Sequence, residues 1–244
     1  MKSSKKLNLP MPSNINLLPH HRAKTLREYG KQYYVDAKGD RFPSVSTILN
    51  ATKPQEDREA LFNWRNRVGV EEANRISGAA SRRGTSTHKH IQRYLLGENV
   101  ACPDTAKPYW DSIEPVLQDI QEVRLVEGSV FHYDLSYAGR VDCVASYKGI
   151  PCVCDWKTAD KPKGSVERLR DSPIQLAAYT GAINQFYQEY GIHLSHALLV
   201  VAVPEIPAEV FWFEPDNMMI YWQQWERRVG EFWQRRGTRT PSSI

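Results

Sequence analysis

The spacing of hydrophobic residues changes about halfway along the chain, at Val123. Before it, apolar side chains recur every three or four residues, which predicts helices over 54–96 and 111–123. The residues that share a helix face there are Leu61, Trp64 and Val68, then His88, Ile91 and Leu95, then Ile113, Val116, Leu117 and Ile120. A turn-rich segment at 36–40 predicts a hairpin between 31–35 and 41–45, and a helix start follows at 44–49.

Beyond Val123 the pattern predicts strands with two helices between and after them. The predicted strands cover 124–133, 135–147, 150–156, 194–203 and 209–213. Asp171, Ser172 and Pro173 open a helix to about residue 190, because polar residues cap helices and proline is tolerated at the first position. An amphipathic helix is predicted over 216–236. We therefore expect an α/β fold, a mixed central sheet flanked by helices.

This pattern shows no repeat and no composition break, so we expect one domain over 29–244. Its hairpin and helical N-terminal portion would cover 29–122, and its core 123–244. The 244 residues are 41% hydrophobic and 25% charged, with no apolar run near the ~20 residues of a membrane-spanning helix. This composition argues against a membrane protein and a disordered chain. The net charge of +4 is too small to indicate a partner by itself.

Residues 1–28 are expected to form a flexible basic arm. The arm contains no acid before Glu28, which resembles a mitochondrial transit peptide in charge. However, Pro10, Pro12 and Pro19 would break the amphipathic helix that such a peptide needs. We therefore expect a cytoplasmic protein, of a bacterium or of a phage-infected cell, rather than a mitochondrial one.

Candidate chemistry lies on the two strands around Lys148 and Gly149. If these two residues form the hairpin turn, the numbers of each cross-strand pair sum to about 297, and Asp142 faces Asp155. Lys157 lies two residues further on, on the same face as Asp155. Two facing carboxylates share a proton or bind a cation, and oxygen ligands of this kind suit Mg²⁺ or Mn²⁺.

Plainer interpretations of these residues stay open at this point. The Asp–Asp–Lys group is also compatible with a solvated sheet face, although the apolar residues around it indicate buried strands, where charges are costly. By spacing alone, His88 is a core histidine one turn from Ile91. Gln175 and Tyr179, four residues apart, form a local hydrogen-bonded pair on one helix face.

The motifs taken together resemble the PD-(D/E)XK nuclease superfamily, in its RecB-like branch and near the mitochondrial genome maintenance exonuclease family with its phage and bacterial relatives. The resemblance covers about 43–236. It is carried by the segments Pro43-Ser-Val-Ser-Thr-Ile-Leu49, Gly84-Thr-Ser-Thr-His88, Glu127, Gly139-Arg-Val-Asp-Cys-Val-Ala145, Asp155-Trp-Lys-Thr158 and Gln175-Leu-Ala-Ala-Tyr179. Two departures are Val141 in place of the motif's proline and Asp155 in place of glutamate.

This resemblance implies a PD-(D/E)XK core and a role for each motif residue. Asp142 and Asp155 become the metal-binding carboxylates and Lys157 the catalytic lysine. His88 adds a metal ligand, and Glu127 matches the acid on the first core strand. Gln175 and Tyr179 lie near the scissile phosphate. Some RecB-like nucleases hold an iron–sulfur cluster, but no cysteine follows Cys154 here, so we expect none.

Charge is distributed unevenly around the motif histidine. No acid occurs between Glu72 and Glu98, and a second basic stretch follows Lys157. Basic residues that neutralise phosphates supply most of the affinity for nucleic acid, although such runs are usually solvated faces. The candidate nucleic-acid-binding residues are Arg82, Arg83, Lys89, Arg93, Lys161 and Lys163.

The resulting hypothesis is a monomeric DNA exonuclease that depends on Mg²⁺ or Mn²⁺. Hydrolysis follows from the acids and the lysine, whereas the preference for single-stranded DNA with a free end comes from the resemblance. One alternative is a nuclease selective for flaps or for double-strand-break processing. Another is a DNA-binding module that has lost its chemistry, which the presence of Asp142, Asp155 and Lys157 argues against.

Overall fold

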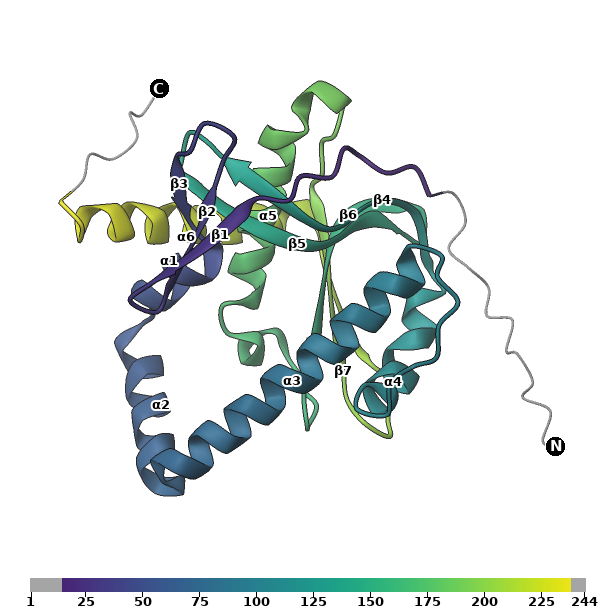
Figure 1. Ribbon diagram of the computed structural model, residues 1–244, viewed down its shortest axis with the longest axis horizontal. Helices are drawn as coiled ribbons and strands as arrows, with labels where there is room; N and C mark the ends of the chain where they lie inside the picture. Colours follow the sequence, from purple (N-terminus) through teal and green to yellow (C-terminus); the bar gives the residue numbers. More distant parts are fainter. Residues whose placement is uncertain (1–14, 238–244) are drawn as a thin grey trace.

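Two β-sheets and six α-helices make up residues 15–237, the part of the chain that the computed structural model describes (Figure 1). The smaller sheet is antiparallel, with β1 (Lys24–Glu28), β2 (Lys31–Val35) and β3 (Arg41–Pro43) in that order. The larger sheet follows chain order through β4 (Ile120–His132), β5 (Tyr137–Tyr147), β6 (Ile150–Thr158), β7 (His196–Ala202) and β8 (Glu209–Phe213).

The helices divide between the N-terminal half, the crossover and the end of the chain. They are α1 (Val45–Ala51), α2 (Gln55–Val68), α3 (Val70–Leu95), α4 (Lys107–Leu117), α5 (Ser172–Phe186) and α6 (Pro215–Gln234), with short 3₁₀ turns η1 (Val166–Leu169) and η2 (Gln188–Tyr190). The Ser44 hydroxyl caps α1 by accepting the Thr47 N–H at 3.0 Å. Within the described chain, none of these helices has the length and apolar character needed to cross a membrane.

Only β6 and β7 pair in parallel in the larger sheet, because α5 crosses over between them. The other neighbouring strands are antiparallel. Side chains alternate between two buried clusters, so that Val153 of β6 packs with α1, α5 and α6, whereas Cys152, Cys154 and Trp156 pack with α3 and α4. Both faces are thus covered, and the predicted α/β fold with a mixed sheet between helices is confirmed.

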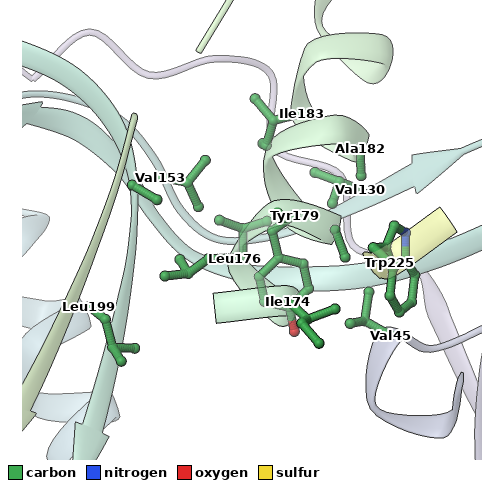
Figure 2. Packing of buried hydrophobic residues seen from close by; sticks show 14 of the residues in the cluster. Val45, Val130, Val153, Ile174, Leu176, Tyr179, Ala182, Ile183, Leu199 and Trp225 are labelled. Atoms are coloured by element: carbon green, nitrogen blue, oxygen red, sulfur yellow. The ribbon is translucent and has the colours of Figure 1, made fainter. Parts of the chain in front are cut away.

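Helix α5 is apolar around most of its surface because it lies between the sheet and α6. Figure 2 shows Leu176, Tyr179 and Ile183 of α5 between sheet residues such as Val130 and Leu199. On the opposite face of the sheet, Cys152 and Cys154 are fully buried and pack as small hydrophobic residues. α5 therefore covers the face of β6 from which Asp155 and Lys157 project.

Several predicted boundaries differ from the structure. The helix predicted over 111–123 ends at Leu117, and β4 begins at Ile120, because Ile120 pairs with Tyr147 and so extends the sheet. The strand predicted over 135–147 begins at Tyr137, as β5. The predicted apolar face of α2 is not buried, and Leu61 is 45% exposed. In Figure 1, α2 and the start of α3 extend away from the sheet and meet at Gly69.

The flexible arm predicted over 1–28 is corrected for residues 15–28. The N–H groups of Asn16 and Leu18 donate to the carbonyls of Val123 and Arg124 at 3.1 and 2.7 Å, and β1 pairs with β2. The basic segment is thereby attached to the edge of β4. Residues 1–14 lie outside the described part, and the wider division into an arm and one domain over 29–244 stays a prediction.

His132 at the end of β4 is a buried histidine that the sequence pattern did not single out. Its ring stacks on Tyr137 and Trp222, with centroids 5.0 and 5.7 Å apart. Its Nδ1 accepts the Leu135 N–H at 3.2 Å, which requires that nitrogen to be unprotonated. Burial lowers the pKa of His132 to about 4, with Asp134 opposing the shift.

We predict that this ring makes the protein less stable in weak acid. A pKa below the unfolded value of 6.5 means that the unfolded chain binds the proton more tightly, so stability is full above pH 6.5 and falls toward pH 4. The loss reaches about 3 kcal/mol. Chemical denaturation from pH 4 to 7 measures the free energy of unfolding, which should depend less steeply on pH in His132→Phe than in the wild type. The exposed His193→Gln serves as control, and equal slopes in all three proteins would contradict the assignment.

Candidate active site

Two strands and a helix bring His88, Glu127 and Asp142 together. The pairs Val126↔Cys143 and Gly128↔Val141 set Glu127 of β4 opposite Asp142 of β5. His88 of α3 places Nδ1 3.5 Å from Asp142 Oδ2 and 3.8 Å from Glu127 Oε1. One ligand atom from each residue lies within 4.8 Å of the others. His88 thus faces the acids.

The second acid pair forms where β5 and β6 separate. The predicted hairpin register is confirmed from Tyr147↔Ile150 to Cys143↔Cys154, one pair short of Asp142 and Asp155. Beyond that last pair, the Asp142 carboxylate takes the place of a backbone partner, because its Oδ2 accepts the Trp156 N–H at 2.9 Å. Asp155 has no pairing partner on β5 and is paired only with Leu199 of β7. The Asp155 side chain is 3% exposed, and its Oδ2 lies 2.6 Å from Lys157 Nζ.

Helix α5 supplies the remaining predicted site residues. Lys157 Nζ donates to Gln175 Oε1 at 3.0 Å, and Gln175 Nε2 donates to the Tyr179 hydroxyl at 3.0 Å. The local pair predicted from the spacing of Gln175 and Tyr179 is therefore present, and it contacts the lysine. A Cβ atom on Gly139 would come within 2.5 Å of the Tyr179 ring, so the glycine of the motif lets this ring lie on β5.

The buried charges in this site depend on one another. Burial opposes the charge of His88, but the carboxylates of Asp142 and Glu127 outweigh it and raise the histidine pKa to about 10. Burial raises the pKa of Asp155 to about 6, with the Lys157 ammonium opposing. Burial also disfavours ionised Asp142, yet His88 and Lys157 lower its pKa. Two cationic side chains thus neutralise an acidic site, as a metal ion would.

Glu127 occupies the site with a left-handed backbone. Its φ of 51° is uncommon for a residue with a side chain and costs on the order of 1 kcal/mol or more. Its second carboxylate oxygen, Oε2, lies 2.9 Å from Arg140 Nε. Sequence reasoning did not select Arg140, although its position two residues before Asp142 on β5 places both side chains on one strand face. Strand alternation was the signal that could have found it.

The predicted nucleic-acid-binding residues separate into two groups. Lys89 lines a cleft beside His88, with Gly84, Thr85, Gln92, Glu127 and Arg140. Arg82 of α3 and Lys161 after β6 are exposed. The loop that carries Lys163 is fixed by Glu209, whose carboxylate accepts the N–H groups of Lys163 and Gly164, both at 2.6 Å.

Arg83 and Arg93 are engaged with acids instead. Arg83 pairs with Asp160 at 2.5 Å and lies over the Tyr109 ring, 5.2 Å from its centroid. Arg93 pairs with Glu98 at 2.8 Å. An arginine that already has a carboxylate partner gains less from a phosphate, so these two are weaker candidates than Lys89 and Arg82.

The donor set fits a divalent cation. The imidazole of His88 and the carboxylates of Glu127 and Asp142 are ligands that suit Mn²⁺ or Mg²⁺. In the metal-free protein, the protonated His88 ring supplies the positive charge that a metal ion would otherwise bring to these acids. In residues 15–237 these three form the one group of close metal-ligating atoms found, and Asp155 lies outside it. Asp155, which the resemblance assigns to the metal, stays a predicted ligand.

We predict that Mn²⁺ binding tightens as pH rises. His88 must lose its proton to bind a metal, and its pKa of about 10 means that this proton is present at neutral pH. Calorimetric titration without DNA should give a Kd up to about tenfold lower at pH 8 than at pH 7, above the range in which Asp155 titrates. His88→Gln should bind more weakly, with a smaller pH dependence. A wild-type Kd equal at both pH values contradicts this.

We predict that Gly139→Ala destabilises the fold through Tyr179. The added methyl group must displace the aromatic ring, at a cost of about 1–3 kcal/mol. In a Tyr179→Ala background the same substitution should cost much less, because the obstacle is gone. Denaturant unfolding of the four proteins measures this coupling, and additive costs would show that the two residues do not interact.

Comparison with known proteins agrees with the motif arrangement. No family model matches the chain. Mitochondrial genome maintenance exonuclease 1 of Xenopus tropicalis is 34% identical over 198 residues, which cover 78% of this chain and 57% of that protein. The Homo sapiens protein of the same name is 30% identical over 199 residues, covering 78% and 58%. The chain thus spans less than two thirds of the length of these relatives.

A solved structure is more distant. A crystal structure of a candidate exonuclease from Eubacterium rectale aligns with a TM-score of 0.45 and 12% identity, over 70% of this chain and 75% of that one. This likeness is too weak to carry an argument. The matches to these curated relatives, which are named mitochondrial genome maintenance exonuclease 1, support the exonuclease family that the motifs predict.

Proposed function

We propose that this protein is a DNA exonuclease that uses Mg²⁺ or Mn²⁺ to hydrolyse phosphodiester bonds from a free end of single-stranded DNA. One observation supports it above all: the metal-ligating group of His88, Glu127 and Asp142 lies beside a half-buried lysine, Lys157, that is held by an acid and an amide. The curated relatives carry the word exonuclease in their names.

Each group in the site has a place in this chemistry. A metal ion held by His88, Glu127 and Asp142 would neutralise a phosphate oxygen and make a water molecule more acidic. Hydrolysis then requires that water to lose a proton and form a bond to phosphorus, while the bond to the leaving oxygen breaks and that oxygen gains a proton.

Lys157 is positioned to act as a cation. Burial lowers the pKa of Lys157, but Asp155 and Asp142 outweigh this and raise it, so the amine is protonated at neutral pH. Of the roles open to this lysine, stabilising the negative charge that gathers on the phosphate therefore fits better than taking a proton from water. Gln175 and Asp155 orient the ammonium, and Tyr179 orients Gln175.

The proposed substrate preference and cellular setting rest on separate observations. The single-strand preference comes from family resemblance and from the exposed basic residues Arg82, Lys89 and Lys161 near the site. The relatives are named as mitochondrial proteins, whereas the sequence led us to expect a bacterial or phage-infected cytoplasm; that location and the monomeric state stay proposals.

We predict that Lys157→Met slows hydrolysis of end-labelled linear single-stranded DNA by roughly 10²–10⁴-fold. The variant keeps the aliphatic stem and removes the charge that stabilises the reacting phosphate. Lys148→Met, at the far turn of the same hairpin, should retain the wild-type rate. Chelation by EDTA should abolish hydrolysis.

Circular substrates test the exonuclease assignment in the same assay. Covalently closed single-stranded circles should be spared, because they offer no free end. Rapid nicking of circles would indicate an endonuclease instead. DNA binding without turnover of any substrate would indicate a binding module.

A further inference from the structure

A second groove continues from the active-site cleft toward the N-terminal sheet. We call it the N-terminal groove; its walls include His20, Arg22, Thr25, Arg27, Gln32 and Tyr34. Gln92, Glu127 and Arg140 line both the groove and the cleft beside His88. The two hollows are therefore adjacent, and Glu127, a candidate metal ligand, lies where they meet.

The basic wall of this groove is held in place by β4. The Ser129 N–H donates to the His21 carbonyl at 3.1 Å, and the Ala23 N–H donates to the Ser129 hydroxyl at 3.3 Å. His20 Nε2 lies 3.2 Å from the Val126 carbonyl, next to Glu127. Arg22 is therefore attached to the strand that carries the site acid.

Strand pairing decides which basic residues face the groove. The pairs Thr25↔Tyr34 and Arg27↔Gln32 put these four side chains on one face of the smaller sheet, and all four line the groove. Alternation puts Lys24 and Lys31 on the opposite face. On the groove face of the sheet Arg27 is thus the basic residue, and Lys24 and Lys31 lie on the other face.

Two arginines of the groove lack acidic partners, whereas the third, Arg140, pairs with Glu127. Neither Arg22 nor Arg27 makes an ion pair or a side-chain hydrogen bond with any described residue, and both are exposed. Arg83 and Arg93, by contrast, are paired with acids. Unpaired guanidinium groups beside hydroxyl and amide side chains are suited to bind phosphate oxygens.

The order of residues defines a path through the site. Along α3 the cleft runs from Gly84 past His88 to Gln92, and the N-terminal groove begins at Gln92. The exposed Arg82 therefore lies before the metal-ligating group along α3, and Arg22 and Arg27 lie beyond Gln92 on the other side. A strand bound at both sides would cross the candidate metal site.

We propose that the N-terminal groove binds the phosphodiester backbone of the DNA strand on the side of the scissile bond away from Arg82. Arg22 and Arg27 are the principal contacts, and recognition is independent of sequence because the groove offers charge rather than base-reading edges. This subsite rests on the proposed nuclease function, and it gives the substrate a second anchor that the sequence did not predict.

The test compares two double variants that each lose two positive charges from the segment that forms β1 and β2 or leads into them. Arg22→Ala/Arg27→Ala removes the groove arginines, and Lys24→Ala/Lys31→Ala removes two lysines from the opposite face. Fluorescence anisotropy with a labelled 20-nucleotide single strand in EDTA should show roughly tenfold weaker binding for the arginine variant. In a plot of the logarithm of the association constant against the logarithm of the salt concentration, the slope for the arginine variant should be less steep by about 1.4, as expected for two lost phosphate contacts. The lysine variant should stay within twofold of the wild type.

Further arms exclude a folding defect and a terminal phosphate site. Arg22→Lys/Arg27→Lys should recover most of the affinity, and all variants should unfold at the wild-type temperature. Strands with and without a 5′ or 3′ phosphate should be affected alike; a loss confined to one end group would replace the backbone proposal with an end-binding site. Equal losses in the arginine and lysine variants, or none in either, would overturn the proposal.

Failure of the groove and failure of the nuclease are distinguishable. If the wild type degrades DNA with Mg²⁺ while the arginine variant binds normally, the groove proposal is wrong and the function stands. If the wild type does not degrade DNA while the arginine variant loses affinity, the nuclease proposal is wrong and the groove stands as a phosphate-binding surface.

Discussion

Three carboxylates gathered on β4, β5 and β6 of the larger sheet impose the main physical constraint on this structure. Glu127, Asp142 and Asp155 lie where β5 and β6 separate, and little water reaches them. Acids so placed are stable only with positive charge beside them. His88 and Lys157 supply that charge, and a divalent cation would supply more of it. The repulsion among these carboxylates lowers the stability of the fold, and it also favours the binding of a metal ion, which in turn can bind a phosphate.

The helices of the fold can be understood from that constraint. α3 crosses one sheet face and delivers His88, while its buried residues Ile91 and Leu95 anchor it to the core. α5 crosses the other and delivers Gln175 beside Lys157. Because α5 is packed between the sheet and α6 (Figure 2), its polar residues have little freedom to move. The hydrogen bonds among Lys157, Gln175 and Tyr179 are therefore a property of core packing as well as of the site.

Glu127 connects the metal-ligating group to the N-terminal part of the chain. One carboxylate oxygen faces His88 and the other faces Arg140, and the strand that carries Glu127 also holds the segment around His20 and Arg22. Its left-handed backbone is compatible with a residue selected for what it binds rather than for strand stability. A substrate strand that spans both hollows would pass this residue.

The sequence by itself determined the parts that local rules control. The turn at Lys148 and Gly149 set the β5–β6 register, and helical spacing put Gln175 next to Tyr179, because these relations involve neighbours a few residues apart. Tertiary structure decided that the β5–β6 pairing ends before Asp142, that α2 stays exposed, and that the segment before β1 docks on β4. The docking is held by contacts such as those of His20 with Val126 and Ala23 with Ser129, 106 residues apart, whose partners no local period encodes.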